Sequence, residues 1–275
     1  MLEKVVQIYV WIFARIFFAN WNRFLFRLSL GGLGILNYQS SKVSGEQAFL
    51  KSYLPSQHGV LIDIGANQGN YTKEALTINS NLKGFCFEPH PKTFNRLSEN
   101  LSHLKNIKTI NKGLSNSSGN IALYDYPDRD GSTHASIFKE VITGIHHSKK
   151  YVAHHIDVTT LDEFIEKEQI DEISLLKIDT EGNELEILRG GAKALSSGKI
   201  KAIHFEFNEM NVISRKYFRD FWEILRGYKI YRLLPNGMLE IKAYNPLYCE
   251  IFAYQNIVAI IPPALLKKST PKGNM

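Results

Sequence analysis

Cysteine is scarce in this sequence: its 275 residues include only Cys86 and Cys249. The two lie in different predicted elements, and their number and spacing fit neither a metal cluster nor a disulfide framework. With 44% hydrophobic and 22% charged residues, the chain is long enough to bury one substantial core without disulfide bonds. We therefore expect one main domain with extensions, in a reducing and cytoplasmic compartment.

The sequence also lacks a basic run interleaved with aromatic residues. Its formal net charge is +6, but the lysines and arginines are scattered along the chain. Proteins that bind nucleic acid concentrate such charge on one face or in one segment. We therefore expect no nucleic-acid partner.

No uninterrupted apolar run reaches the ~20 residues that span a bilayer. The densest apolar stretch, residues 5–18, is interrupted by Arg15, and no small-residue cleavage site of a signal peptide follows it. Residues 1–44 are thus an N-terminal extension with two open interpretations. In the first, residues 5–27 form a helix that lies in a membrane interface, at the inner face of the membrane. In the second, they pack on the domain or on a second subunit. The sequence does not predict the oligomeric state.

The dinucleotide fingerprint Gly-x-Gly-x-x-Gly is missing as well, although a glycine turn follows the first predicted buried strand. The turn reads Asp63-x-Gly65-x-Asn67-x-Gly69, and a second predicted strand ends at Glu88. Glycines let the backbone approach a ligand, and an acid ~20 residues further on can bind ribose hydroxyls. Asp63 would repel a pyrophosphate but pair with an ammonium group. The pattern favours S-adenosylmethionine over NAD, unless Asp63 only caps the next helix.

Apolar runs alternate with amphipathic stretches from Val60 onward, which indicates a parallel sheet covered by helices. Residues 113–126 predict a hairpin-like insertion, residues 127–155 an irregular lid or substrate loop, and residues 263–275 a basic, flexible tail. The predicted strands are 60–64, 84–88, 107–110, 173–179, 200–206, 228–234, 238–243 and 256–261, and the predicted helices include 45–54, 92–104 and 217–225.

Several of these segments together resemble the FkbM family of S-adenosylmethionine-dependent methyltransferases. The resemblance runs from about Gly45 to Ile261 and implies a Rossmann-like class I methyltransferase fold, with a mostly parallel central sheet and helices on both faces. It defines residues 45–262 as the methyltransferase domain. The activity that the resemblance implies is usually O-methylation of a hydroxyl on a sugar, glycan or secondary metabolite. The matching segments are Gly45-Glu46, Asp63 to Thr72, Phe87-Glu88-Pro89, Thr160-Leu161-Asp162, Leu176 to Glu184 and Phe205-Glu206.

The resemblance implies that the glycine turn holds the methionyl end of S-adenosylmethionine. Tyr71 would close over that end at the head of the following helix. Glu88 would accept hydrogen bonds from the ribose hydroxyls, or alternatively cap the helix after Pro89. The implied cofactor-binding residues are Asp63, Gly65, Asn67, Gly69, Tyr71 and Glu88.

The family's strand order would also bring Asp179, Glu181 and Glu206 to one cleft as catalytic residues. Clustered carboxylates raise one another's pKa, so one of them can take the proton of an acceptor hydroxyl. These acids could instead hold a divalent cation, but we prefer direct base catalysis and assign no metal ligand. Lys177 is expected to pair with one of the acids.

Alternatives stay open for each catalytic candidate. Asp179 and Glu181 can cap the helix that follows Gly182. His204 is a rival base, although a lone histidine in a strand is more often a satisfied core residue. The irregular loop supplies further rivals, which are His134, His146, His147, His154 and His155.

We therefore interpret the chain as an S-adenosylmethionine-dependent O-methyltransferase with a small-molecule or glycan acceptor. One alternative is an NAD-linked sugar oxidoreductase or epimerase, suggested by the glycine turn and the ribose-binding acid. The other is a non-catalytic, membrane-associated scaffold, suggested by residues 5–27.

Overall fold

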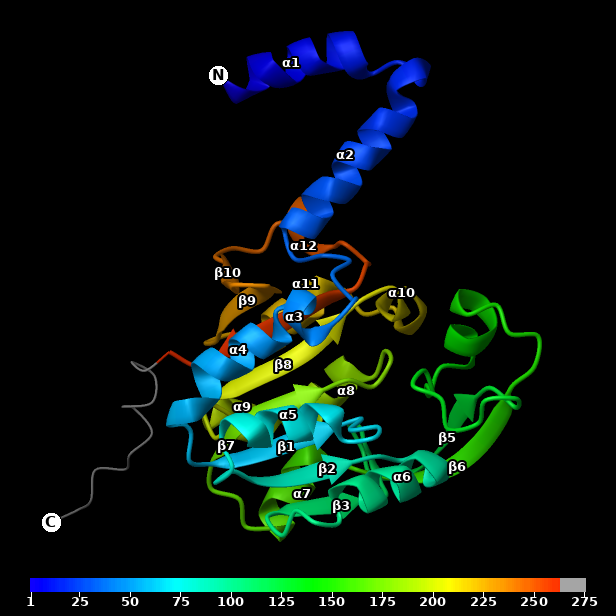
Figure 1. The fold of residues 1–275 in the computed structure, drawn as a ribbon, viewed down its shortest axis with the longest axis vertical. Coiled ribbons are helices and arrows are strands. Elements are labelled where there is room, and N and C mark those ends of the chain that lie inside the picture. Colours follow the sequence, from blue (N-terminus) through cyan, green and yellow to red (C-terminus); the bar gives the residue numbers. More distant parts are fainter. Residues whose placement is uncertain (263–275) are drawn as a thin grey trace, which may run out of the picture.

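The computed structural model describes residues 1–262, so the predicted basic tail at 263–275 lies outside the described residues. An eight-stranded sheet forms the centre of the molecule (Figure 1). In chain order its strands are β1 (Val60–Ile64), β2 (Lys83–Phe87), β3 (Ile107–Ile110), β7 (Ile173–Ile178), β8 (Ala202–Phe207), β9 (Lys229–Leu234), β10 (Gly237–Ile241) and β11 (Gln255–Ile260).

The strand order is β10-β9-β11-β8-β7-β1-β2-β3. The five strands from β8 to β3 are parallel, whereas β11 runs antiparallel to both β8 and β9, and β10 antiparallel to β9. The carboxyl ends of β2, β1, β7 and β8 therefore meet at one edge of the sheet, which is where ligands bind in open α/β folds.

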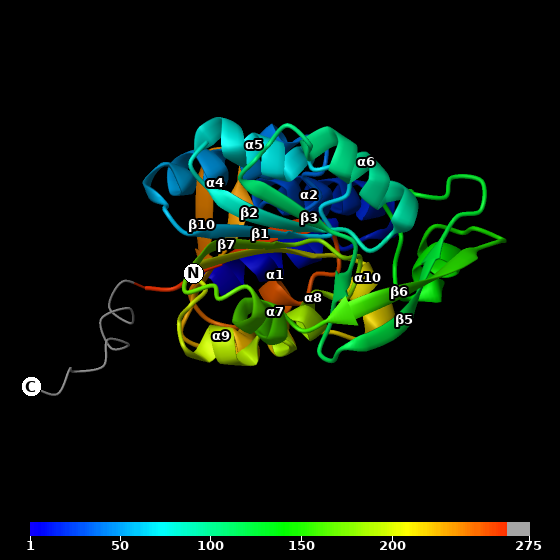
Figure 2. The same ribbon diagram turned by 90° about the horizontal axis from the view of Figure 1, so that it is seen from below.

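Helices cover both faces of the sheet, as the sequence predicts (Figure 2). On one face lie α4 (Glu46–Tyr53), α5 (Asn70–Ile78) and α6 (Pro91–Leu101). On the other lie α7 (Leu161–Lys167), α8 (Glu184–Arg189), α9 (Ala192–Ser196) and α11 (Phe218–Ile224). Short helical segments are η1 (Ile16–Phe18), α3 (Ser41–Ser44), η2 (Leu54–Ser56), α10 (Met210–Ser214) and α12 (Pro246–Cys249). The Rossmann-like α/β fold class is thus confirmed.

Alternate residues of the central strands belong to two separate cores. Ile62 and Leu176 pack on the side of α7 to α9, whereas Leu61 and Leu175 pack against α4 and α5. Side chains of a strand alternate between faces. Two polar residues, Asp63 and Lys177, therefore also point toward α4 and α5, and they lie in register with each other on β1 and β7. A polar pair is buried between the sheet and these helices.

The insertion after β3 differs from the prediction. It forms a second sheet of β4 (Gly113–Leu114), β5 (Gly119–Asp125) and β6 (Val152–Thr159), in the order β4-β6-β5. The predicted hairpin within 113–126 is wrong, because β5 pairs antiparallel with β6 and β4 pairs parallel with it. The predicted irregular loop at 127–155 is wrong for its last four residues, which begin β6. Between β5 and β6 the chain makes a π-helical turn, η3 (Val141–Ile145).

Two helices at the N-terminus, α1 (Leu2–Phe13) and α2 (Ala19–Gly32), project away from the sheet (Figure 1). Helix α1 has no buried residue, and α2 buries only Leu30. Contact with the α/β body begins just after α2, where Ile35 bridges to Gln255 and the Leu36 N–H donates to the Tyr254 carbonyl. Within residues 1–262, none of the helices has the length and apolar character needed to cross a bilayer.

Candidate active site

The loop between β1 and α5 is shaped by a close backbone approach. Gly65 has φ +76°, and a Cβ atom there would lie 1.8 Å from the carbonyl oxygen of Asp179. Only glycine fits this contact, which joins the ends of β1 and β7. Gly69 has φ +82° at the start of α5, and a Cβ there would meet the Leu101 side chain. Gly69 lines neither of the two cavities described below, so its role is in the turn itself.

Two buried carboxylates flank this loop. Asp63 Oδ2 accepts a hydrogen bond of 2.7 Å from Thr72 Oγ1 on α5, and burial raises the pKa of Asp63 to about 6. Glu88 accepts from the N–H of Asn67 at 3.0 Å and from the N–H of His90 at 2.8 Å, and burial raises its pKa to about 7. Each Glu88 oxygen keeps a free lone pair, so these bonds orient the carboxylate without using its full acceptor capacity.

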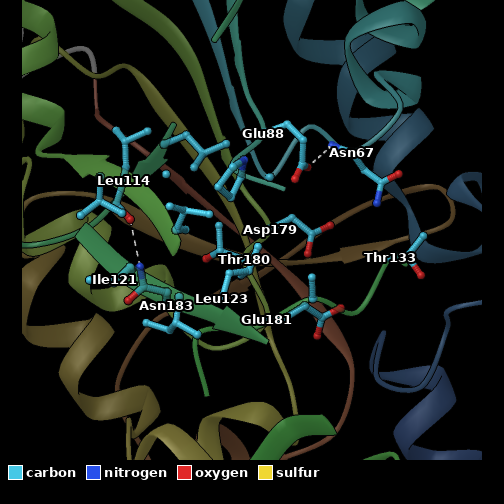
Figure 3. A pocket seen from close by; sticks show the side chains of 18 of the residues that line it. Asn67, Glu88, Leu114, Ile121, Leu123, Thr133, Asp179, Thr180, Glu181 and Asn183 are labelled. Carbon is cyan, nitrogen blue, oxygen red and sulfur yellow. Dashed lines mark hydrogen bonds between the residues drawn. The ribbon is translucent and has the colours of Figure 1, made fainter. Parts of the chain in front are cut away.

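Two cavities meet at the carboxyl edge of the sheet. The first, which we call the apolar chamber, has a volume of about 70 Å³ and lies between the loop and the second sheet (Figure 3). Its apolar wall consists of Leu114, Ile121, Leu123, Ala135, Ile137, Ile156 and Val158, and Glu88 and Asn67 stand at one side. The alternation of Ile121 with Leu123 and of Ile156 with Val158 explains why β5 and β6 form this wall.

The second cavity, which we call the acidic cleft, is larger, at about 710 Å³, and more open. Its charged lining is Glu46, Asp63, Glu74, Lys177, Asp179, Glu181, Glu206 and Glu209, and its polar and aromatic lining includes Tyr38, Ser41, Asn67, Tyr71, Asn208 and Tyr254. Five residues line both cavities: Gly65, Asn67, Thr133, Asp179 and Glu181. A ligand can therefore extend from the chamber into the cleft.

The three predicted catalytic acids do come together in the acidic cleft. Asp179 directly follows β7, and Glu206 lies on β8, the adjacent parallel strand. The Asp179 side chain is 38% exposed. Burial raises the pKa of Glu206 well above its usual range, and the negative charge of the neighbouring Asp179 is the second largest cause. The predicted effect of clustering is present, but desolvation is the larger cause.

Lys177 is the buried counterion of this cluster. Its ammonium lies 3.8 Å from Asp179 Oδ2 and 3.9 Å from Glu46 Oε1, and it is 5.5 Å from the centre of the Tyr71 ring. The side chain is 3% exposed, and Nζ has no hydrogen-bond partner within residues 1–262. The pairing predicted for Lys177 is confirmed, although Glu46, on a helix far earlier in the chain, is a partner that the sequence did not reveal.

Glu181 occupies a strained position in the loop after β7. It has φ +54°, which is uncommon for a residue with a side chain. Burial raises its pKa to about 7, and His134 Nδ1 lies 3.4 Å from its Oε1. Its Oε2 is buried and has no hydrogen-bond partner within the described residues. An unpartnered carboxylate oxygen beside a large cleft is available to a ligand.

Glu184 holds the same loop, although the sequence analysis assigned it no role. Glu184 Oε1 accepts from the N–H and the hydroxyl of Thr180 at 2.9 and 3.0 Å, and from the Gly182 N–H at 3.1 Å. Glu184 thus satisfies the backbone before α8. Across the part of the chain that the structure describes, neither Asp179 nor Glu181 caps this helix, which leaves their side chains to the cleft.

His204 is a satisfied core residue and not a rival base. It is fully buried, its Nε2 lies 2.9 Å from Asn256 Oδ1, and its Nδ1 lies 2.8 Å from the Tyr71 hydroxyl. Both ring nitrogens are therefore occupied, and burial lowers the pKa of His204 well below its usual value. Tyr71 lines the acidic cleft as predicted, but its hydroxyl points to His204. Of the histidines in the predicted loop, His134 and His146 line the cleft.

A second polar cluster ties the segment after β5 to the start of α6. Asp130 Oδ1 lies 2.9 Å from His90 Nε2 and 2.7 Å from His154 Nε2, and Asp130 Oδ2 lies 2.6 Å from Lys92 Nζ. His90, Asp130 and His154 are close enough together to hold a metal ion. None of these three residues lines the acidic cleft. No motif in the sequence marks them, because they come together only in the folded chain.

The segments that form this site also match known proteins. A family model described as "Methyltransferase FkbM domain" matches residues 63–230. Hexuronic acid methyltransferase AglP of Haloferax volcanii is 31% identical over 156 residues, which cover 56% of this chain and 59% of that protein. 2-O-methyltransferase NoeI of Sinorhizobium fredii is 22% identical over 198 residues, or 68% of this chain and 79% of that protein. The match thus spans less than two thirds of the length of AglP.

Replacing Lys177 by methionine should destabilise the fold by about 3–5 kcal/mol at pH 7.5, because the buried carboxylates lose their counterion. The loss should be smaller at pH 5, where Asp63, whose pKa burial raises to about 6, takes up a proton and needs no counterion. Urea unfolding at both pH values measures this loss of unfolding free energy. The exposed Lys193→Met is the matched control, and an equal loss at both pH values would contradict the electrostatic explanation.

Proposed function

The chain belongs to the FkbM methyltransferase family, and from this premise we propose that it transfers a methyl group from S-adenosylmethionine to a sugar hydroxyl. The observation that carries the proposal is the junction of the apolar chamber with the acidic cleft along Gly65, Asn67, Asp179 and Glu181. The family match and the methyltransferase relatives support this hypothesis. They give no support to an NAD-linked oxidoreductase or a scaffold.

The residues of the two cavities fit S-adenosylmethionine. Its adenine suits the apolar wall of the chamber, and its ribose hydroxyls suit the free lone pairs of Glu88. Its ammonium group suits Asp63, which stands in the cleft beside the glycine turn. When bound, S-adenosylmethionine supplies a methyl group on a positively charged sulfur. An acidic cleft favours such a cation, and the same carboxylates disfavour the pyrophosphate of NAD.

We propose that Glu181 is the base among the three predicted acids. Its unpartnered Oε2 and its pKa of about 7 suit the removal of a proton from an acceptor hydroxyl near neutral pH. As the O–H bond breaks, Glu181 takes the proton and the hydroxyl oxygen becomes the nucleophile. Asp179 and Glu206 line the same cleft and bind the acceptor, while Lys177 keeps part of this cluster ionised.

The acceptor in this proposal is a sugar. The acidic cleft is large, open and rich in side chains that hydrogen-bond to hydroxyls, among them Ser41, Asn208 and Glu209. The printed names of the two relatives specify a hexuronic acid and a 2-O-position, which supports a ring carrying several hydroxyls. Proximity and alignment of the acceptor oxygen supply much of the rate of a methyl transfer.

We also propose that Asp179, Glu181 and Glu206 act without a divalent cation. Lys177 already places a positive charge between Asp179 and Glu46, where a metal bound by these carboxylates would have to compete with it.

The binding of S-adenosylmethionine tests the first part of the proposal. In isothermal titration, Glu88→Gln should weaken binding at least tenfold, since it removes a charge-assisted hydrogen bond worth about 1.5–3 kcal/mol. Asp63→Asn should weaken it as well. The exposed Glu99→Gln should bind like the wild type. Absence of binding by the wild type, or full affinity in both site variants, would refute the assignment.

The pH dependence of turnover tests the base. Because Glu181 acts deprotonated and its pKa is raised to about 7, kcat should rise with pH through about 7 and then level off. Glu181→Gln should lower kcat by about 10²–10⁴ and remove this step. The exposed Glu140→Gln serves as control. A Glu181→Gln enzyme that keeps both its rate and its pH step would assign the base elsewhere.

Chelation tests the metal proposal. EDTA should leave the rate of methyl transfer unchanged, since no step needs a divalent cation at the acids. Thermal unfolding measured in parallel would detect a structural ion at His90, Asp130 and His154, because its removal lowers the unfolding temperature. Loss of turnover with EDTA, at unchanged unfolding temperature and reversed by Mg²⁺, would contradict the proposal.

A further inference from the structure

The N-terminal helices leave an unusually large apolar surface uncovered. All of α1 is free of buried residues, and Trp11 is 74% exposed. At the bend between α1 and α2, Ile16 is 96% exposed and Phe17 is 89% exposed. Along α2 the exposed large apolar residues are Trp21, Phe24, Phe26 and Leu28. We call α1, the bend and α2 the N-terminal elbow (Figure 1).

The second half of α1 is apolar around its whole circumference. Residues 8–12 are five consecutive large apolar residues, and at 100° per residue they point in all directions around the helix axis. A helix that packs on one protein partner needs only a single apolar stripe, whereas a helix that is apolar all round suits a protein core or a lipid phase. Because α1 is not buried in the core of residues 1–262, a lipid phase is the environment that suits it.

The charges of the elbow select the kind of lipid. Between residues 1 and 32 the charged side chains are Glu3, Lys4, Arg15, Arg23 and Arg27, so the basic ones predominate. None of the ion pairs within residues 1–262 uses one of these arginines. Free arginines beside exposed aromatic rings attract anionic headgroups, and two copies of the elbow would repel each other.

The dimensions fit a surface position. At 1.5 Å per residue, α1 is about 18 Å long and α2 about 21 Å, and both are shorter than the ~30 Å hydrocarbon core. Interfacial helices lie ~5–10 Å deep at the boundary of headgroups and acyl chains. The elbow can thus enter one leaflet without crossing the membrane.

The elbow is coupled directly to the acidic cleft. Just past the end of α2, Ile35 is fully buried and bridges to Gln255, and the Leu36 N–H donates to the Tyr254 carbonyl at 2.8 Å. Tyr38 then packs edge-to-face on Tyr254, and both tyrosines line the cleft. A short and well-anchored connection therefore joins the elbow to residues that line the cleft.

We infer that the elbow binds the surface of an anionic bilayer and that the acceptor is a saccharide carried on a lipid anchor in that bilayer. The second half of this inference rests on the proposed sugar methyltransferase function. A lipid-anchored sugar diffuses in the plane of the membrane, and a cleft held beside that plane meets it at high effective concentration. The aqueous, polar lining of the cleft receives the sugar while the lipid chain stays in the leaflet.

Vesicle flotation tests the surface. The full chain should float with vesicles of phosphatidylglycerol and phosphatidylcholine, and far less with phosphatidylcholine alone or in high salt. The double variant Ile16→Glu/Phe17→Glu should bind at least tenfold more weakly. The matched control is Leu247→Glu/Tyr248→Glu, an exposed apolar pair on α12, and it should float like the wild type. Equal flotation of all three proteins, or a wild type that stays in solution as a dimer, would overturn the inference.

Labelling tests the acceptor separately. The wild type receives S-adenosylmethionine with a labelled methyl group, together with the membranes and the soluble fraction of its host cells. The label should enter saccharides that extract into organic solvent, and Ile16→Glu/Phe17→Glu should label them at least tenfold more slowly while binding S-adenosylmethionine normally. Label in water-soluble saccharides alone would overturn the lipid-anchored acceptor but keep the proposed function. No label in either fraction and no S-adenosylmethionine binding would overturn both.

Discussion

The buried ammonium of Lys177 is the interaction on which the site depends. It lies between Asp179 and Glu46, in register with Asp63 on one neighbouring strand and with His204 on the other. Carboxylates buried without a counterion would take up protons or destabilise the fold. A single lysine neutralises only part of the cluster, so the cleft keeps a negative character. A negative cleft suits the cationic methyl donor that the proposed function requires.

Much of the site could be predicted from the sequence because its signals are local. The glycine turn after β1, the acid that follows β2 and the segment at the end of β7 each lie within a few residues of a strand end. A parallel sheet then brings strand ends together. The contacts that the sequence missed join distant segments. Glu46 reaches Lys177 from α4, β5 finds its partner in β6 across a long intervening loop, and Asp130 meets His90 and His154 only after folding.

Burial also decides between the roles that residue type leaves open. A histidine and a tyrosine at strand and helix positions beside the cleft are plausible ligand-binding groups, yet His204 and the Tyr71 hydroxyl satisfy each other inside the fold. Glu184, which has no evident role in the sequence, shapes the loop that presents Glu181. The N-terminal elbow shows the opposite case, because most of its large apolar side chains stay exposed and the segment that follows it leads through Tyr38 to the cleft.

A crystal structure of the protein with S-adenosylhomocysteine would show whether the chamber and the cleft bind the methyl donor. The adenine should lie against Leu114, Ile121 and Ile156, the ribose hydroxyls on Glu88, and the amino group beside Asp63. The sulfur should then face the acidic cleft near Glu181. Density for the nucleoside outside the apolar chamber, or ribose hydroxyls that do not contact Glu88, would contradict it.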